Sequence, residues 1–403
     1  MKRKLLILTS WYPSEASPIR GIFVQDQAQV LSRTYDVAVL APRFVGLRGL
    51  TEGESLPRSR VEESNGIRVF REETLFPPRM FFRLRRWLCA KLARRGFANV
   101  FKTWGEPDII HAHVVWPGGW MALILGRDCA IPVVLTEHSG PFLMHLQSET
   151  QRRLVRETLM HVNRVVAVSP SLAAQIHAFC PGVHIDIIGN VILTEFFTPL
   201  EDTPEEEVRP TKRFLSVAPL GEGKGIHHLL EAMQLLAQRG VTSCEVFIGG
   251  EGPAHCRLED MARALNLSDR CHFLGMLGRS DVRHWMRRCD VFVLPSLEET
   301  FGVVLGEAMA CGKPVIATRC GGPEFVVVPE TGLIVDVGNP SAIAEAMDKF
   351  ISDRPTFDSK IIRQSLVTRF GEEAFLCNIS SVYEQLFRAG DGACFLTKCE
   401  KAV

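Results

Sequence analysis

Short apolar runs alternate with amphipathic helical stretches along this chain, and the alternation occurs twice. Parallel sheets need apolar strands of this kind, because crossover helices bury both of their faces. The first series of predicted strands comprises Lys4–Leu8, Asp36–Leu40, Ile67–Phe70, Ile109–His111, Val133–Thr136 and Arg164–Val168. The second comprises Arg213–Val217, Glu245–Gly249, Cys271–Leu274, Val291–Leu294, Val315–Ala317 and Gly332–Val335. The pattern predicts an α/β fold with two doubly wound domains.

A proline-punctuated acidic stretch separates the two series, directly after Phe197. It has few apolar residues, which is typical of an exposed linker. We therefore expect an N-terminal domain over residues 1–197, a linker over 198–211 and a C-terminal domain over 212–370. Residues 371–403 are expected to form a helical tail that crosses back to the N-terminal domain. In such sheets ligands bind beyond the carboxyl ends of the strands.

Composition narrows the class of protein. The 403 residues hold 46 Lys plus Arg and 46 Asp plus Glu, so no overall charge favours nucleic acid. The 12 cysteines include no C-x-x-C pair, which indicates neither a disulfide framework nor a zinc site and favours a reducing, cytoplasmic setting. No run of eighteen apolar residues occurs, and Leu5–Leu8 is too short for a signal peptide.

The segment after the predicted strand Val291–Leu294 is the most informative one. We expect a polar turn, then a helix that begins near Thr300–Gly302 and ends at Gly312, with Thr300 able to serve as its N-cap. The free N–H groups at its start, on Phe301, Gly302 and Val303, would form an anion site that the helix dipole reinforces. Gly302 would let a phosphate approach the backbone closely.

Two carboxylates frame this anion site. Glu299 lies just before the predicted helix, and Glu307 is expected about two turns inside it. They could accept hydrogen bonds from hydroxyl groups at the two ends of a bound diphosphate, which suits a sugar nucleotide. The alternative is that Glu299 is a solvated carboxylate favoured by the helix dipole and Glu307 a surface residue.

The segment from Glu299 to Ala317, with Phe301-Gly302 inside and Gly312-Lys313-Pro314 after the helix, resembles the donor-site signature of family-4 retaining glycosyltransferases. The resemblance implies a GT-B fold, in which two Rossmann-like domains face each other across a cleft, and a role in polysaccharide or glycoconjugate biosynthesis. It further implies that Glu307 holds the ribose and that Glu299 faces the donor sugar. The residues from Thr300 to Val303 would bind the diphosphate and sugar.

Other turns of the second series resemble the same family. Lys224 fits the family's basic pair and would stabilise the leaving diphosphate, but Pro219 stands where the family has arginine. Gly250 belongs to a glycine-rich turn like the family's own. Met276 ends the segment where the family holds the nucleobase through main-chain groups. The alternative for Lys224 is a solvated residue that starts a helix.

In the first series, Gly21 would open the first helix, and the resemblance implies that this glycine loop lies against acceptor and diphosphate. Arg20 is a candidate for the acceptor side and for the missing arginine. His111 and His113 point the same way along a strand. By resemblance, His113 contacts the donor sugar. His138 follows the next strand and is either an acceptor-side residue or a hydrogen-bonded structural histidine.

No acidic residue occurs between Thr74 and Gly105, whereas residues 79–102 hold eight Lys and Arg interleaved with Trp and Phe. This pattern is typical of a helix that lies on anionic lipid. A crossover helix with a solvated basic side is the alternative. Membrane contact would place the protein on the inner face of the plasma membrane.

The sequence thus predicts an enzyme, a hexosyl- or N-acetylhexosaminyltransferase that moves a sugar from a nucleotide-diphosphate sugar to a hydroxyl of a glycan or lipid-linked oligosaccharide. The configuration would be retained, and no cofactor or metal is expected, since Lys224 and backbone amides would replace a divalent ion. The rival interpretations are a sugar-nucleotide epimerase or phosphorylase on the same fold, and a non-catalytic transferase-like subunit.

Overall fold

The computed structural model describes residues 2–14, 17, 19–45, 58–75, 82–200, 210–352 and 356–399, with side chains up to residue 388. The chain divides into two compact units. The first comprises residues 1–168, 172–189 and 375–403, and the second comprises 169–171 and 190–374. Most of the predicted linker, residues 201–209, lies outside the described residues.

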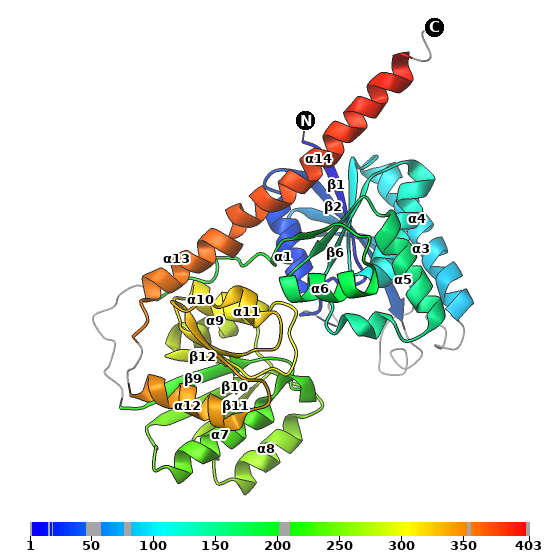
Figure 1. Ribbon diagram of the computed structural model, residues 1–403. Coiled ribbons are helices and arrows are strands. Elements are labelled where there is room, and N and C mark those ends of the chain that lie inside the picture. Colours follow the sequence, from blue (N-terminus) through cyan, green and yellow to red (C-terminus); the bar gives the residue numbers. More distant parts are fainter. Residues whose placement is uncertain are drawn as a thin grey trace. The chain divides into compact units, whose positions relative to one another are not determined.

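The first unit contains an eight-stranded sheet of order β3-β4-β2-β1-β5-β6-β7-β8 (Figure 1). Only the β3–β4 pair is antiparallel; every other neighbouring pair is parallel. The strands are β1 (Lys4–Leu8), β2 (Asp36–Val45), β3 (Ser59–Ser64), β4 (Ile67–Leu75), β5 (Ile109–His113), β6 (Val133–Glu137), β7 (Arg164–Ala167) and β8 (Ile185–Ile187). All six predicted strands are confirmed, whereas β3 and β8 were not predicted.

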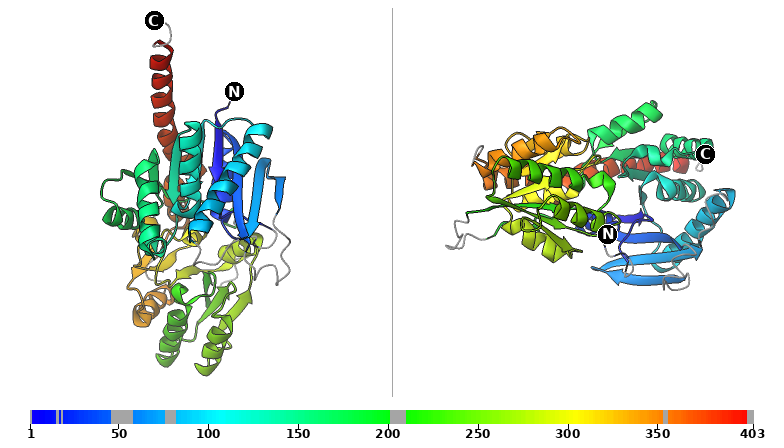
Figure 2. Two further views of the ribbon diagram at one scale, coloured as in Figure 1. Left: turned by 90° about the vertical axis from the view of Figure 1, so that its right-hand side faces the viewer. Right: turned by 90° about the horizontal axis from the view of Figure 1, so that it is seen from below.

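Helices cover the first sheet on both faces (Figure 2). They are α1 (Ile22–Leu31), α3 (Phe82–Thr103), α4 (Trp120–Cys129), α5 (Glu149–His161) and α6 (Pro170–Phe179). The C-terminal helix α14 (Glu372–Cys399) also packs on this unit. Its Tyr383 is fully buried, its ring lies 5.5 Å from that of Tyr35, and its hydroxyl is 2.6 Å from Nδ1 of His111.

The second unit holds a six-stranded parallel sheet of order β11-β10-β9-β12-β13-β14. Its strands are β9 (Lys212–Val217), β10 (Cys244–Gly249), β11 (Cys271–Gly275), β12 (Val291–Leu294), β13 (Val315–Thr318) and β14 (Gly332–Val335). Its helices are α7 (Ile226–Gln238), α8 (His255–Ala264), α9 (Arg279–Arg288), α10 (Val303–Ala310), α11 (Pro323–Val326), α12 (Pro340–Ile351) and α13 (Ser359–Phe370). All six predicted strands are confirmed here too.

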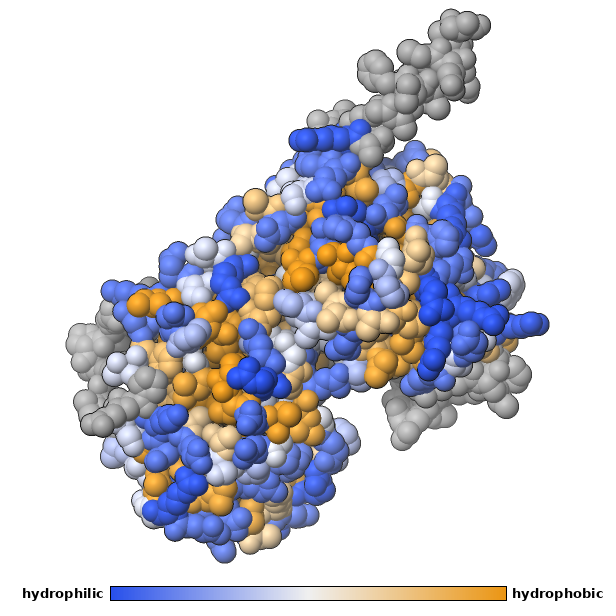
Figure 3. Space-filling model, viewed as in Figure 1, coloured by the Kyte–Doolittle hydropathy of each residue, from blue (hydrophilic) through white to orange (hydrophobic). Residues whose placement is uncertain are grey.

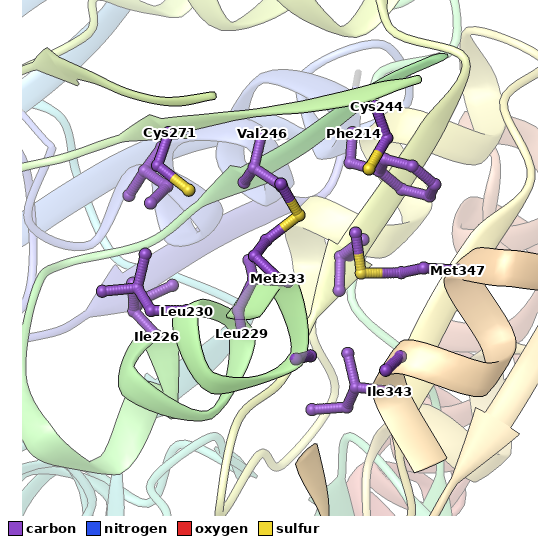
Figure 4. Close-up of a cluster of buried hydrophobic side chains, with 14 of the residues drawn as sticks. Phe214, Ile226, Leu229, Leu230, Met233, Cys244, Val246, Cys271, Ile343 and Met347 are labelled. Carbon is purple, nitrogen blue, oxygen red and sulfur yellow. The ribbon is translucent and has the colours of Figure 1, made fainter. Parts of the chain in front are cut away.

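One face of this sheet is covered by α7, α8 and α12 (Figure 1). Met233 of α7 lies opposite Val246 of β10, with Leu230 of α7 on the side toward β11 and Met347 of α12 on the other side (Figure 4). These side chains are fully buried. This packing fixes α7 and α12 against the sheet, and so it also fixes the positions of the strand ends from which the following turns begin.

Replacing Leu230 with Ala should lower the free energy of unfolding by about 2–5 kcal/mol, because a fully buried leucine leaves a cavity. Ile361→Ala is the matched control, since that side chain is 51% exposed, and should change stability by less than about 0.5 kcal/mol. Urea unfolding measures both. Equal losses in the two variants would contradict this description of the core.

Candidate functional site

The turn after β12 leads into α10, as predicted, but the predicted N-cap is wrong. Gly302, with φ 83°, is the N-cap of α10, and the helix begins at Val303. Only a residue without Cβ adopts this left-handed conformation readily, so the glycine and not Thr300 turns the chain into the helix. Consequently Glu307 is the fifth helical residue, little more than one turn inside and not two.

The N-terminus of α10 has the donors that an anion needs. Within the described part of the chain, the N–H groups of Gly302 and Val303 donate no recorded hydrogen bond. Phe301 is 1% exposed and its ring packs 5.1 Å from that of Phe370, so its side chain belongs to the core and only its backbone can serve the site. Glu307 is half-buried and already has an interaction within the protein.

Lys224 and Glu299 form an ion pair at the same edge of the sheet. Nζ of Lys224 lies 2.6 Å from Oε1 of Glu299, and the hydroxyl of Ser296 donates to the same oxygen at 2.9 Å. Both side chains keep some exposure, 28% and 14%. The neighbouring Glu298 has a raised pKa, because of partial burial and then because of the charge of Glu299. The pair is therefore a half-buried charged group that a ligand can reach.

Close backbone packing brings these two residues together. A Cβ on Gly225 would lie 1.9 Å from the carbonyl oxygen of Pro295, so only glycine fits between the two turns. The N–H of Leu297 donates to the carbonyl of Gly223 at 2.8 Å. The turn after β9 thus packs against the turn after β12, which places Lys224 beside Glu299.

The remaining predicted donor residues lie on neighbouring turns. Gly250 follows β10, and its N–H donates to the carbonyl of Gly275 at 2.8 Å. Met276 follows β11 and is 60% exposed. Pro219 is exposed in the turn after β9. Arg257 of α8, which the sequence did not single out, contacts this turn. Its Nη2 donates to both carboxylate oxygens of Glu222, each at 2.7 Å.

In the first unit, Gly21 is the N-cap of α1, as expected for a residue that opens the first helix. Arg20 before it is exposed. The structure places the two histidines of the prediction side by side. Nδ1 of His113 lies 2.9 Å from Nε2 of His138, and the rings are stacked at 5.2 Å.

His113 is buried too deeply to be the only one of the two histidines that contacts substrate. It is 0% exposed between His111 and His138, whereas His138 is 6% exposed. His111 is a structural residue, because its nitrogens reach Thr136 Oγ1 at 2.7 Å and the Tyr383 hydroxyl. Sequence reasoning also missed Glu137, whose buried carboxylate accepts three backbone N–H groups.

The basic segment is helix α3 from Phe82 onward; residues 79–81 lie outside the described range. Its inner face packs on the sheet, so α3 is a crossover helix. Its outer face is exposed, with Trp87 at 56% and Leu84 at 44%. A groove of about 400 Å³ lies between α3, α4 and α5, and its lining includes Arg83, Arg86 and Arg127. Hydrophilic residues dominate the surface over these helices (Figure 3).

The described residues show neither a metal-binding cluster nor a membrane-spanning helix. No cluster of three or more His, Cys, Asp or Glu side chains with a metal-binding arrangement occurs among them. None of their helices is long and apolar enough to cross a membrane. The cysteines whose side chains are described are all free.

Two family models match the chain. Residues 201–367 match glycosyl transferases group 1, and residues 21–190 match the glycosyl transferase 4-like domain. N-acetyl-alpha-D-glucosaminyl L-malate synthase of Bacillus anthracis is 25% identical over 70% of this chain and 75% of its own length. The Bacillus subtilis protein TuaC, named for teichuronic acid biosynthesis, is 29% identical over 86% of this chain and 89% of its own.

Solved structures show the same fold. Sucrose-phosphate synthase of Thermosynechococcus elongatus superposes with a TM-score of 0.78 at 24% identity, over 96% of this chain and 100% of that one. Anabaena HepE, solved with UDP, has a TM-score of 0.72 at 20% identity over 95% and 100%. Two α/β units with parallel or mostly parallel sheets and these neighbours define a GT-B fold. The chain belongs to the family-4 type of GT-B glycosyltransferases, so the predicted fold class and nucleotide-sugar transfer are confirmed.

Acid should destabilise the first unit through its buried histidines. Burial lowers the pKa of His111 from 6.5 to about 3, so the unfolded chain takes up the proton first as the pH falls. Stability is therefore lost from about pH 6.5 downward, by about 1.4 kcal/mol per pH unit for one such histidine.

Thermal midpoints at pH 7.5 and 5.5 measure this effect. His111→Gln should lose less on acidification than the wild type, because one buried neutral histidine is gone. His184→Gln is the control, since this side chain is 70% exposed, and should behave like the wild type. An unchanged pH dependence in His111→Gln would refute the assignment.

Proposed function

We propose that this enzyme transfers a hexosyl or N-acetylhexosaminyl group from a nucleoside-diphosphate sugar to a hydroxyl of a glycan or lipid-linked acceptor, with retention of configuration. The observation that carries the site assignment is the Lys224–Glu299 pair beside the N-terminus of α10. A cation, a carboxylate and N–H groups then occupy one strand-end surface, where parallel sheets bind ligands.

Each group has a chemical role in this proposal. The N–H groups of Gly302 and Val303 bind the diphosphate at the positive end of the helix dipole. Lys224 turns from Glu299 toward the leaving phosphate as negative charge develops. Glu299 then accepts hydrogen bonds from the donor sugar, and Glu307 binds the ribose.

The reaction balances without a protein nucleophile. The acceptor oxygen forms a bond to the anomeric carbon on the face that the diphosphate leaves, and the bond from that carbon to the phosphate oxygen breaks. The acceptor proton passes to the departing diphosphate, which leaves as the nucleoside diphosphate. We propose that Lys224 and the amides supply the charge stabilisation that a divalent metal gives other transferases.

Named relatives support the substrate class. The name of the Bacillus anthracis protein gives an N-acetylglucosaminyl group as the sugar it transfers, and HepE was solved with UDP-glucose as well as UDP. A uridine diphosphate sugar is therefore the first donor to test. TuaC's name refers to teichuronic acid, a polysaccharide product, which favours a glycan acceptor.

Glu299→Gln should lower kcat by about 10²–10³-fold, because a positioned charged partner of the sugar and of Lys224 is lost. Glu298→Gln is the matched control: it removes the adjacent, exposed carboxylate and should leave kcat within about threefold. Initial rates with the uridine diphosphate sugar measure both. Equal kcat in Glu299→Gln and the wild type would rule out this site.

We further propose that the enzyme is cytoplasmic and binds the inner face of the plasma membrane through α3. Among the described residues, Arg83 and Arg86 form no ion pair, and both line the groove together with the exposed Trp87. Unpaired cations beside an exposed aromatic ring suit an anionic lipid headgroup and the interface below it.

Vesicle sedimentation tests this contact. Arg83→Gln/Arg86→Gln should weaken binding to phosphatidylglycerol vesicles by about thirtyfold, since each basic residue contributes about 1 kcal/mol near such a surface. Arg94→Gln/Arg153→Gln removes the same charge from residues that pair with Asp128 and Glu149, and should bind like the wild type. Equal loss in both double variants, or no wild-type binding, contradicts membrane contact through this face.

A further inference from the structure

Glu137, the last residue of β6, has a fully buried carboxylate. No Lys or Arg forms an ion pair with it among the described residues, and the ring nitrogen Nε2 of His145 lies 3.9 Å from Oε1. Instead, Oε2 accepts the N–H of Val115 at 2.6 Å, and Oε1 accepts those of His138 and Ser139 at 2.9 and 2.7 Å. Three backbone donors thus hold a buried negative charge in place.

These hydrogen bonds join two separate turns. Val115 follows β5, whereas His138 and Ser139 follow β6. Between β5 and Val115 stands Val114, with φ 67° and ψ 124°. A β-branched residue in this region is strained by about 1–3 kcal/mol and keeps the conformation only where its surroundings enforce it. Its N–H donates to the carbonyl of Thr136 at 2.9 Å, so β6 and Glu137 fix the turn on both sides of Val114.

The two turns carry the histidine pair. His113 directly precedes the strained Val114, and His138 directly follows Glu137. The 2.9 Å contact between their rings therefore depends on how Glu137 spaces the turns. Nε2 of His113 is buried and makes no hydrogen bond to the described residues. A buried polar atom without a partner costs about 1–3 kcal/mol, and such atoms are tolerated where they serve a function.

We propose that Glu137 is a positioning residue for sugar transfer: its carboxylate sets the spacing of His113 and His138, so that the pair offers hydrogen bonds to hydroxyl groups of a sugar substrate. This inference rests on the proposed function. His138 is the member that reaches the surface, and His113 orients its ring from behind. Burial, then the nearby His111 and His138, hold the pKa of His113 well below its usual range, so it acts as a neutral group.

Neither glutamine nor aspartate can replace Glu137 in joining the two turns. Glutamine would present an NH₂ group to the N–H of Val115, or to those of His138 and Ser139, and two donors would face each other. Aspartate is one methylene shorter and cannot span both turns. The isosteric change Glu137→Gln therefore alters the turn spacing with the least change in volume.

To test this proposal, kcat and the KM for the donor are measured for Glu137→Gln by steady-state kinetics, and its UDP affinity by titration. We expect kcat to fall about 10²-fold, since small misplacements of catalytic groups have effects of this size, with the KM for the donor within about threefold. UDP affinity should be unchanged, because the donor site lies in the other unit. The matched control is Glu72→Gln, another buried carboxylate of this sheet, which is 1% exposed and accepts from Ser59 and Asn99.

Glu72→Gln should lose thermal stability but keep kcat within about twofold. A second readout is the ¹⁵N NMR spectrum of histidine-labelled protein. The ring nitrogens of His113 and His138 should shift in Glu137→Gln and stay in place in Glu72→Gln. Equal kcat losses in the two variants, wild-type kcat in Glu137→Gln, or unshifted ring signals would overturn the inference. Failure of the wild type to bind UDP or transfer sugar would instead refute the proposed function, and the ring signals would still report on Glu137.

Discussion

The close approach of backbone turns at the carboxyl edge of the second sheet is the constraint on which the donor site depends. At Gly225 there is no room for a side chain, because the carbonyl oxygen of Pro295 occupies the position of a Cβ at 1.9 Å. This packing places Lys224 against Glu299, and it holds the turn from which α10 begins. A cation, a carboxylate and helix N–H groups thus lie close together because the backbone turns that carry them are closely packed.

In the first unit, a side chain holds two strand-end turns together. Its turns after β5 and β6 are joined by the Glu137 carboxylate and not by glycine contacts. A buried charge costs more than a glycine contact, and its hydrogen bonds must all be satisfied. The Glu137 carboxylate fixes the positions of the strained Val114 and of the two histidines, His113 and His138. Both units therefore hold functional side chains on rigid strand ends, which limits how far these groups move during the reaction.

Much of this organisation could be predicted from the sequence. Apolar runs identified every strand that is buried on both faces, and the spacing of Glu299 and Glu307 identified the family. The edge strand β3 was missed because its residues alternate between exposed and half-buried, although Asn65-Gly66 behind it is a typical hairpin turn. The N-cap of α10 was misplaced because threonine is a good cap in general, while the left-handed conformation at Gly302 depends on tertiary packing. Glu137 and Arg257 were missed because the contacts that reveal their roles are to Val115 and Glu222, which lie 22 and 35 residues away in the sequence.

We assign the donor site to the N-terminus of α10, Lys224 and the two glutamates Glu299 and Glu307. A crystal structure of the protein with UDP tests this assignment most directly. We expect phosphate oxygens about 2.7–3.2 Å from the N–H nitrogens of Gly302 or Val303, with Lys224 turned toward them and the ribose hydroxyls on Glu307. UDP bound elsewhere, with the Lys224–Glu299 pair and the first turn of α10 unoccupied, would contradict the assignment.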